Sequence, residues 1–129
     1  MKKKHPCLLC MGSNTDRAAH LSAAREALRA EFPDIRFGEE METEAVGSGF
    51  LSPFSNQLAV FSTVRSADEV RFFFKDLEHQ AGRRPEHKAQ GIVQLDIDLL
   101  KYDDTMLKPG DWERPYVRQG WIALSDKFL

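Results

Sequence analysis

Two aspartates, Asp96 and Asp98, stand one residue apart inside the largely apolar run Val93 to Asp104. In a strand, residues two apart lie on one face about 6–7 Å from each other, so both carboxylates would point the same way. The ordinary interpretation is a half-solvated strand whose charged side chains face water. Aspartate is a poor strand former, however, and adjacent like charges repel. A bound Mg²⁺ would offset this cost, which makes the pair a candidate metal site.

A basic segment precedes this strand and could meet the phosphate groups of a substrate. Arg83 and Arg84 follow an expected helix, and Lys88 lies in the turn-rich stretch before the strand. Guanidinium groups suit phosphate oxygens, and a loop can close over a nucleotide. A merely solvated turn explains the same charges equally well. Three later basic residues could add to this face: Lys108, Arg114 and Arg118.

A third group could recognise a flat organic substrate. Phe54, Asn56 and Trp121 combine two aromatic faces with an amide, which suits a heterocycle that has hydrogen-bonding edges. From spacing alone, core aromatics are the more common explanation. Cys7 and Cys10 form a CxxC, but no second such pair accompanies them, and apolar neighbours surround both. We expect these cysteines to act as small hydrophobic residues of a buried strand.

The elements that must position these residues follow from periodicity and from turn residues. Ser66 and Glu69 form a capping box that opens a helix, and Gly82 ends it. The loop 44–55 is long enough to serve binding. The predicted elements in chain order are strand 6–11, helix 15–30, strand 34–43, strand 56–64, helix 66–80 and strand 92–102.

This β-α-β-β-α-β order predicts an α+β fold, the ferredoxin-like βαββαβ sandwich, in which an antiparallel sheet carries its helices on one face. The residues from Asp103 to Leu129 contain turn residues and short apolar pieces. We expect this segment to wrap the open face of the sheet or its edge.

Composition limits the function classes. The chain has 129 residues and is 42% hydrophobic, which predicts a single domain spanning 1–129. Its net charge of −2 argues against nucleic acid or an anionic membrane as partner. No apolar run could span a bilayer, and no signal-peptide hydrophobic region follows the N-terminal lysines. We expect a cytoplasmic monomer that acts on small molecules.

Four motifs occur in a specific order along the chain: CMGSN at 10–14, an asparagine after an aromatic residue at 54–56, LEHQAGR at 77–83 and LDIDLL at 95–100. Together they resemble the 6-hydroxymethyl-7,8-dihydropterin pyrophosphokinase family of folate biosynthesis. The resemblance runs through nearly the whole chain. It implies the ferredoxin-like fold and an enzyme, a diphosphokinase that transfers the pyrophosphoryl group of ATP to the pterin's hydroxymethyl oxygen with two Mg²⁺ ions and releases AMP.

The resemblance also implies roles for individual residues. Asp96 and Asp98 would bind both metal ions, and Arg83 would act with them in catalysis. Gly12, Ser13 and Asn14 would support the pterin pocket. The implied pterin-binding residues are Thr43, Val46, Phe54, Asn56 and Trp121. The implied ATP-binding residues are Glu78, Arg83, Arg84, Lys88, Tyr116 and Arg118.

The chain departs from the family pattern at several positions. Val93 stands where members usually carry an arginine, Gln90 where they carry a tryptophan, and Pro85 where they carry a second arginine that Arg84 could replace. The family's ATP-contacting histidine is missing before Tyr116. Loss of one donor to a transition state costs about 10²–10³ in rate. A catalytically degenerate pterin- or nucleotide-binding module of the same fold therefore remains the alternative.

The metal hypothesis makes a geometric demand on Asp96 and Asp98. Their carboxylates must lie together at a cleft. The hypothesis fails if they are splayed apart, shut away from any cleft, or engaged by ammonium groups.

Overall fold

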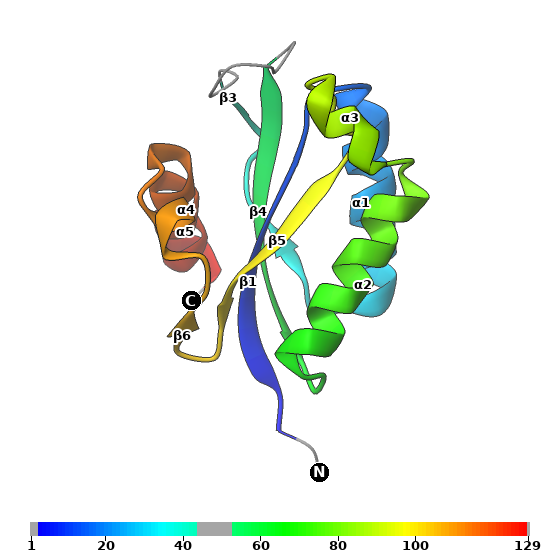
Figure 1. Cartoon of the computed structure of the whole chain (residues 1–129). Helices are drawn as coiled ribbons and strands as arrows, with labels where there is room; N and C mark the ends of the chain where they lie inside the picture. Colours follow the sequence, from blue (N-terminus) through cyan, green and yellow to red (C-terminus); the bar gives the residue numbers. More distant parts are fainter. Residues whose placement is uncertain (1–2, 44–52, 129) are drawn as a thin grey trace.

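An antiparallel sheet lies between two helical layers (Figure 1). The structure is a computed structural model, and it describes residues 3–43 and 53–128. Within these ranges the strands are β1 (His5–Ser13), β2 (Arg36–Phe37), β3 (Met41–Thr43), β4 (Phe54–Thr63), β5 (Asp96–Tyr102) and β6 (Thr105–Met106). Their order is β2-β4-β1-β5-β6, and β3 also pairs with β4.

The two predicted helices pack on the same face of the sheet. They are α1 (Arg17–Glu31) and α2 (Ala67–Gln80), and both contribute to one hydrophobic core with alternate residues of β1, including Leu9 and Met11. The capping box is confirmed, since Ser66 Oγ accepts from Glu69 N at 3.2 Å and Ser66 N donates to Glu69 Oε1 at 3.1 Å. Gly82 follows α2 with φ of +93°, a conformation that favours glycine.

The two predicted helices share one face of the sheet as expected, but further helices cover the other face. The C-terminal segment forms α4 (Pro109–Trp112) and α5 (Pro115–Phe128), which lie on the opposite face (Figure 1). Successive side chains of a strand point to opposite faces of the sheet, and the strands carry apolar residues on this face as well. The buried core on this side consists of Leu8, Leu58 and Leu100 from the strands together with Val117 and Leu124 from α5. The segment covers the open face as expected, but as helices that its short apolar pieces did not predict.

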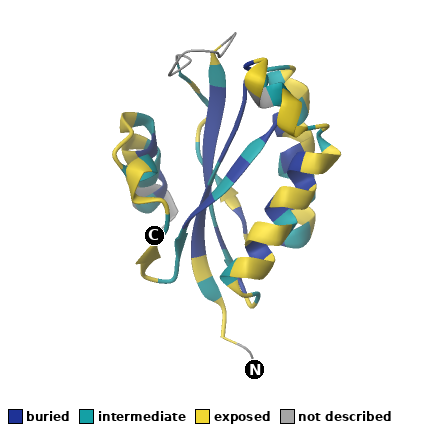
Figure 2. Ribbon diagram, viewed as in Figure 1, coloured by how far each residue is buried: buried dark blue, intermediate teal, exposed yellow. Residues whose placement is uncertain are grey.

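Some predicted boundaries shift. The strand expected over 34–43 is divided into β2 and β3, and the strand expected from residue 92 begins as β5 at Asp96. The basic segment contains a short helix, α3 (Pro85–Ala89). Figure 2 shows the central strands largely buried between the two layers, with the outer faces of the helices exposed. No helix in the described ranges is long and apolar enough to cross a membrane.

Strand β1 places the two cysteines on opposite faces of the sheet. Cys7 is buried with the α1–α2 core, as predicted, and burial raises the pKa of its thiol to about 12. Cys10 packs beside the other core, and burial raises its pKa as well. Strand residues three apart are separated by about 10 Å, beyond the reach of a disulfide, and both cysteines are free.

Candidate functional site

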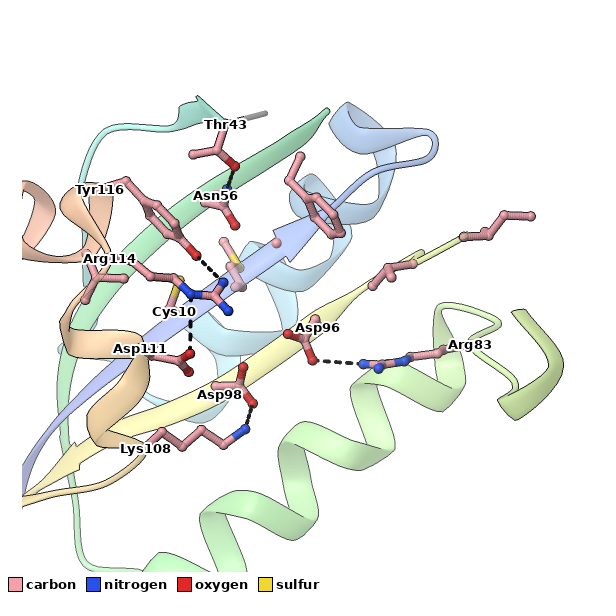
Figure 3. Close-up of a pocket in the computed structure, with 16 residues that line it drawn as sticks. Cys10, Thr43, Asn56, Arg83, Asp96, Asp98, Lys108, Asp111, Arg114 and Tyr116 are labelled. Atoms are coloured by element: carbon pink, nitrogen blue, oxygen red, sulfur yellow. Dashed lines mark hydrogen bonds and ion pairs between the residues drawn. The ribbon is translucent and has the colours of Figure 1, made fainter. Parts of the chain in front are cut away.

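A cavity of about 330 Å³ lies between the sheet and the α4–α5 layer, lined by residues of β1, β3, β4 and β5 on one side (Figure 3). Most of the residues predicted from the sequence meet there. Those lining the cavity are Thr43, Phe54, Asn56, Arg83, Asp96, Asp98 and Tyr116. Two of the later basic residues, Lys108 and Arg114, also line it.

The pleat of β5 sets the direction of the two aspartates. Asp96 and Asp98 both line the cavity, whereas Ile97 between them is buried in the core. Strand β5 runs antiparallel to β1, so Asp96 lies opposite Gly12 and Asp98 opposite Cys10. The carboxylates therefore share one face at an open cavity, as the sequence predicts.

Each carboxylate already has a cationic partner. Arg83 Nη1 donates to Asp96 Oδ1 at 2.9 Å, and Lys108 Nζ donates to Asp98 Oδ1 at 2.5 Å (Figure 3). Burial opposes ionisation of Asp96, but the hydrogen bond and charge of Arg83 hold its pKa below the ordinary value. Burial, followed by the charge of Asp96, raises the pKa of Asp98, and Lys108 only partly offsets this. The two acids therefore differ in electrostatic environment.

These contacts bear directly on the metal hypothesis. The carboxylates are neither splayed apart nor shut away, but an ammonium group engages Asp98, so the hypothesis fails in its simple form and a metal ion could bind here only in competition with Lys108. In the part of the chain that the structure describes, no three His, Cys, Asp or Glu residues gather into a metal site. The aspartates fit only a cation such as Mg²⁺, which binds through one or two carboxylates and takes its other ligands from phosphate and water. Such an ion would meet the positive charge of Lys108 at the same carboxylate.

Arg83 is fixed from behind by Glu78. Glu78 is buried, and its Oε2 accepts from the backbone N–H of Ile97 at 2.9 Å and lies 3.3 Å from Arg83 Nη1. Arg83 Nη1 also donates to the carbonyl of Leu95 at 3.2 Å. Burial is the main cause that raises the pKa of Glu78. Glu78 does not line the cavity; it fastens the end of α2 to β5 and holds Arg83 against Asp96.

An amide and a hydroxyl lie at the other end of the cavity. Asn56 is buried, and its Nδ2 donates to Thr43 Oγ1 at 2.6 Å. Gly12 lies opposite Asn56 in the β1–β4 ladder, and a Cβ at Gly12 would come within 2.6 Å of Asn56 Oδ1. The absence of a side chain at Gly12 is therefore what leaves room for the amide beside Thr43 and Phe54.

Asn14 fixes the segment that leads into β5. Its Nδ2 donates to the carbonyl of Gly91 at 2.8 Å, and its Oδ1 accepts from Val93 N at 2.7 Å. Its own backbone N–H donates to the Val93 carbonyl at 3.0 Å. The GSN motif thus ties the end of β1 to the segment before Asp96.

The α4–α5 layer supplies the opposite wall. Arg114 Nη1 donates to Tyr116 Oη at 3.3 Å, and Arg114 Nε lies 3.6 Å from Asp111 Oδ1. No sequence signal pointed to Asp111, which lines the cavity, and Cys10 was expected only as a core residue. Lys108 directly precedes α4, and Arg114 lies between α4 and α5. The sequence placed both residues only on a common face, because these two helices were not predicted.

Some predicted residues are not brought to this cavity. Trp121 lines a second cavity of about 690 Å³, with its ring centroid 6.0 Å from that of Trp112 and 5.3 Å from Lys101 Nζ. Arg118 Nε donates instead to the carbonyl of Trp112 at 2.9 Å.

Two further predicted residues, Arg84 and Lys88, lie in the basic segment after α2, and one lies outside the described residues. The Arg84 side chain does not line the cavity, and its backbone N–H donates to His87 Nδ1 at 3.3 Å. Lys88 belongs to α3. Val46 lies outside the described residues.

Comparison with known proteins agrees with the family that the motifs indicate. A family model described as 7,8-dihydro-6-hydroxymethylpterin-pyrophosphokinase (HPPK) matches residues 8–126 of the 129-residue chain. A search of curated proteins gives no match. The matched region contains β5 with its aspartates, both sides of the cavity and the α4–α5 layer. The chain therefore belongs to the 7,8-dihydro-6-hydroxymethylpterin-pyrophosphokinase family, the pterin pyrophosphokinases of folate biosynthesis.

Proposed function

We propose that this protein transfers the β,γ-pyrophosphoryl group of ATP to the hydroxymethyl oxygen of 6-hydroxymethyl-7,8-dihydropterin with the assistance of Mg²⁺. One observation carries the proposal: a single cavity has two different ends. Paired carboxylates with basic side chains line one end, and the other end is lined by Asn56, Thr43 and Phe54. We also propose that the strand order β2-β4-β1-β5 is the ferredoxin-like arrangement.

The reaction exchanges one phosphorus–oxygen bond for another. The substrate hydroxyl oxygen attacks the β-phosphorus and releases its proton. The bond between that phosphorus and the oxygen bridging to the α-phosphate breaks, and AMP leaves with the bridging oxygen. The protein must therefore hold the hydroxyl oxygen, the β-phosphorus and the leaving oxygen in line, and stabilise the charge of the phosphates.

The phosphate end of the cavity carries the charges for this task. Asp96 and Asp98 would hold two Mg²⁺ ions, which when bound neutralise the phosphate oxygens and orient them for in-line attack. Arg83 is fixed by Glu78 and would meet a phosphate from the β5 side. Arg114 lines the same cavity and would meet the phosphate from the α4–α5 wall. It would thereby serve in place of the arginine that family members usually carry where this chain has Val93.

The pterin end would recognise the ring. Phe54 supplies an aromatic face, and Asn56 with Thr43 supplies donors and acceptors for the ring edge. Trp121 would have to leave Trp112 and Lys101 to stack on the other side of the ring. We therefore propose that Phe54 stacks on the pterin ring in the conformation seen here. Trp121 would stack on the opposite side of the ring only if it moves when the substrate binds.

Direct detection of AMP tests the proposed function. The protein is incubated with ATP, Mg²⁺ and 6-hydroxymethyl-7,8-dihydropterin, and products are followed by phosphorus NMR. We expect AMP and the pterin pyrophosphate in equal amounts, and neither product when the pterin is omitted. AMP no higher than with an Asp96→Asn variant would reject the proposed reaction.

Gly12→Ala tests the role of Gly12 at the pterin end. The new methyl group would press on Asn56 Oδ1, so we expect a loss of about 1–3 kcal/mol in unfolding free energy together with weaker pterin binding. Chemical denaturation and fluorescence titration with the pterin measure the two effects. Gly110→Ala is the control, because a Cβ there meets no atom within 4 Å. Unchanged pterin affinity in Gly12→Ala would show that Asn56 does not contact the ring.

A second candidate function has its own observation. Asp96 and Asp98 are already neutralised by Arg83 and Lys108, as in a site that binds a ligand without metal chemistry. A degenerate module of the same fold would bind pterin or nucleotide with no AMP formed. Binding of both ligands by calorimetry, combined with a negative phosphorus NMR assay, would favour this function.

A further inference from the structure

Lys108 reaches the proposed metal site from outside the sheet. It lies between β6 and α4, and its Nζ donates to Asp98 Oδ1 at 2.5 Å (Figure 3). The side chain of Asp98 is 22% exposed, whereas that of Lys108 is 54% exposed. The contact therefore joins a largely enclosed acid to a base that solvent can reach.

The backbone directs Lys108 towards this contact. Lys108 has φ of 51° and ψ of 64°, a left-handed conformation that is uncommon for residues other than glycine. Hydrogen bonds on both sides hold it there: Leu107 N donates to the Leu100 carbonyl at 2.7 Å, and Asp111 N donates to the Lys108 carbonyl at 3.0 Å. The fold thus accepts a strained residue where its side chain can reach Asp98.

The two cations of the site differ in how firmly they are held. Arg83 contacts Asp96, Glu78 and the Leu95 carbonyl, and it is about two-thirds buried. Within residues 3–43 and 53–128, Asp98 is the only hydrogen-bond and ion-pair partner of the Lys108 ammonium, although the charges of Asp96 and Asp111 also act on it. An incoming cation would have to break three contacts to displace Arg83, but only one to displace Lys108.

The charge balance at Asp98 requires some cation. Asp98 is partly enclosed and lies beside the like charge of Asp96, so an unpaired carboxylate would be costly there. The ammonium holds Asp98 Oδ1, and its positive charge would repel a divalent ion bound at the same carboxylate. Lysine and metal therefore compete for Asp98, and the released ammonium lies at the edge of a cavity in which a nucleotide's phosphates would sit.

We infer that Lys108 is an exchangeable internal counter-ion, which holds Asp98 before loading and moves to a nucleotide phosphate when Mg²⁺ takes its place. The inference rests on the proposed function and goes beyond it. When metal binds alone, the Lys108–Asp98 ion pair breaks and the ammonium gains no new partner. When nucleotide is also bound, the ammonium can pair with a phosphate, which offsets the lost ion pair. Metal and nucleotide should therefore bind cooperatively, and couplings of this kind are typically about 5–150-fold.

Metal binding without turnover tests the exchange. Mn²⁺ replaces Mg²⁺, and its free concentration is followed by electron paramagnetic resonance in the absence of nucleotide. We expect Lys108→Met to bind Mn²⁺ at least about fivefold more tightly than the unaltered protein, the lower limit of that coupling. Lys108→Arg, which keeps the charge, should remain weak. Lys101→Met is the matched control, because Lys101 lies on β5 with Asp98 but lines the second cavity.

A non-hydrolysable ATP analogue provides the second arm. The analogue should tighten Mn²⁺ binding in both proteins, because its phosphates ligate the metal directly. In Lys108→Met the tightening should be smaller than in the unaltered protein, because no ammonium is released to pair with a phosphate. Lys108→Gln repeats both measurements if the methionine variant does not fold, as judged by circular dichroism.

Equal Mn²⁺ affinity in the unaltered protein and in the uncharged variants would overturn the exchange, as would undetectable binding in all of them. AMP formation is measured separately. A protein that makes AMP while Lys108→Met leaves Mn²⁺ binding unchanged would keep the proposed function and lose only this inference.

Discussion

Asp98→Asn is expected to lower the rate of AMP formation by at least about 10²–10³-fold, the range for loss of one group that stabilises charge in a transition state. The amide keeps the shape of the carboxylate but loses the negative charge that would hold a metal ion at the phosphates. The initial rate of AMP release at saturating ATP and pterin measures the effect.

The fold should survive this change. Asp98→Asn removes a like charge beside Asp96, and it leaves without a partner a lysine that is already 54% exposed. Asp104→Asn is the matched control, because Asp104 is an exposed acid that immediately precedes β6. Its rate should equal that of the unaltered protein. Equal rates in Asp98→Asn and Asp104→Asn, with both variants folded, would remove Asp98 from the mechanism.

Leu124→Ala is expected to lower the unfolding free energy by about 2–5 kcal/mol, the usual cost of truncating a fully buried leucine. Leu124 is 1% exposed and belongs to the core between α5 and the sheet, with Leu58 and Leu100. It also packs against Gly38, where an added Cβ would lie 3.3 Å from Leu124 Cγ. Chemical denaturation followed by circular dichroism measures the loss.

Ile122→Ala provides the control on the same helix. Ile122 is 58% exposed, so its truncation should change the unfolding free energy by no more than about 0.5 kcal/mol. If Leu124→Ala costs no more than Ile122→Ala, then α5 does not cover the second face of the sheet. The α4–α5 wall of the cavity, with Arg114 and Tyr116, would then lose its support.

The sequence by itself determined the features that depend on near neighbours. Alternation placed Asp96 and Asp98 on one face because a strand repeats every two residues. The capping box of Ser66 and Glu69 spans a single helical turn, so a spacing of three residues was sufficient to predict it. The order of four local motifs also sufficed to indicate the family that the family model shows.

Only the tertiary structure decided which distant residues meet. Asn14 clamps residues 77 and 79 positions away, and Lys108 reaches Asp98 across a strand pair and a turn. Helix α5 packs on the second apolar face of the sheet. In this position Trp121 lines a different cavity from Phe54. Periodicity predicts on which side of its own helix or strand a residue lies. Contacts between elements depend on how the whole chain packs so that all of its apolar faces are buried together.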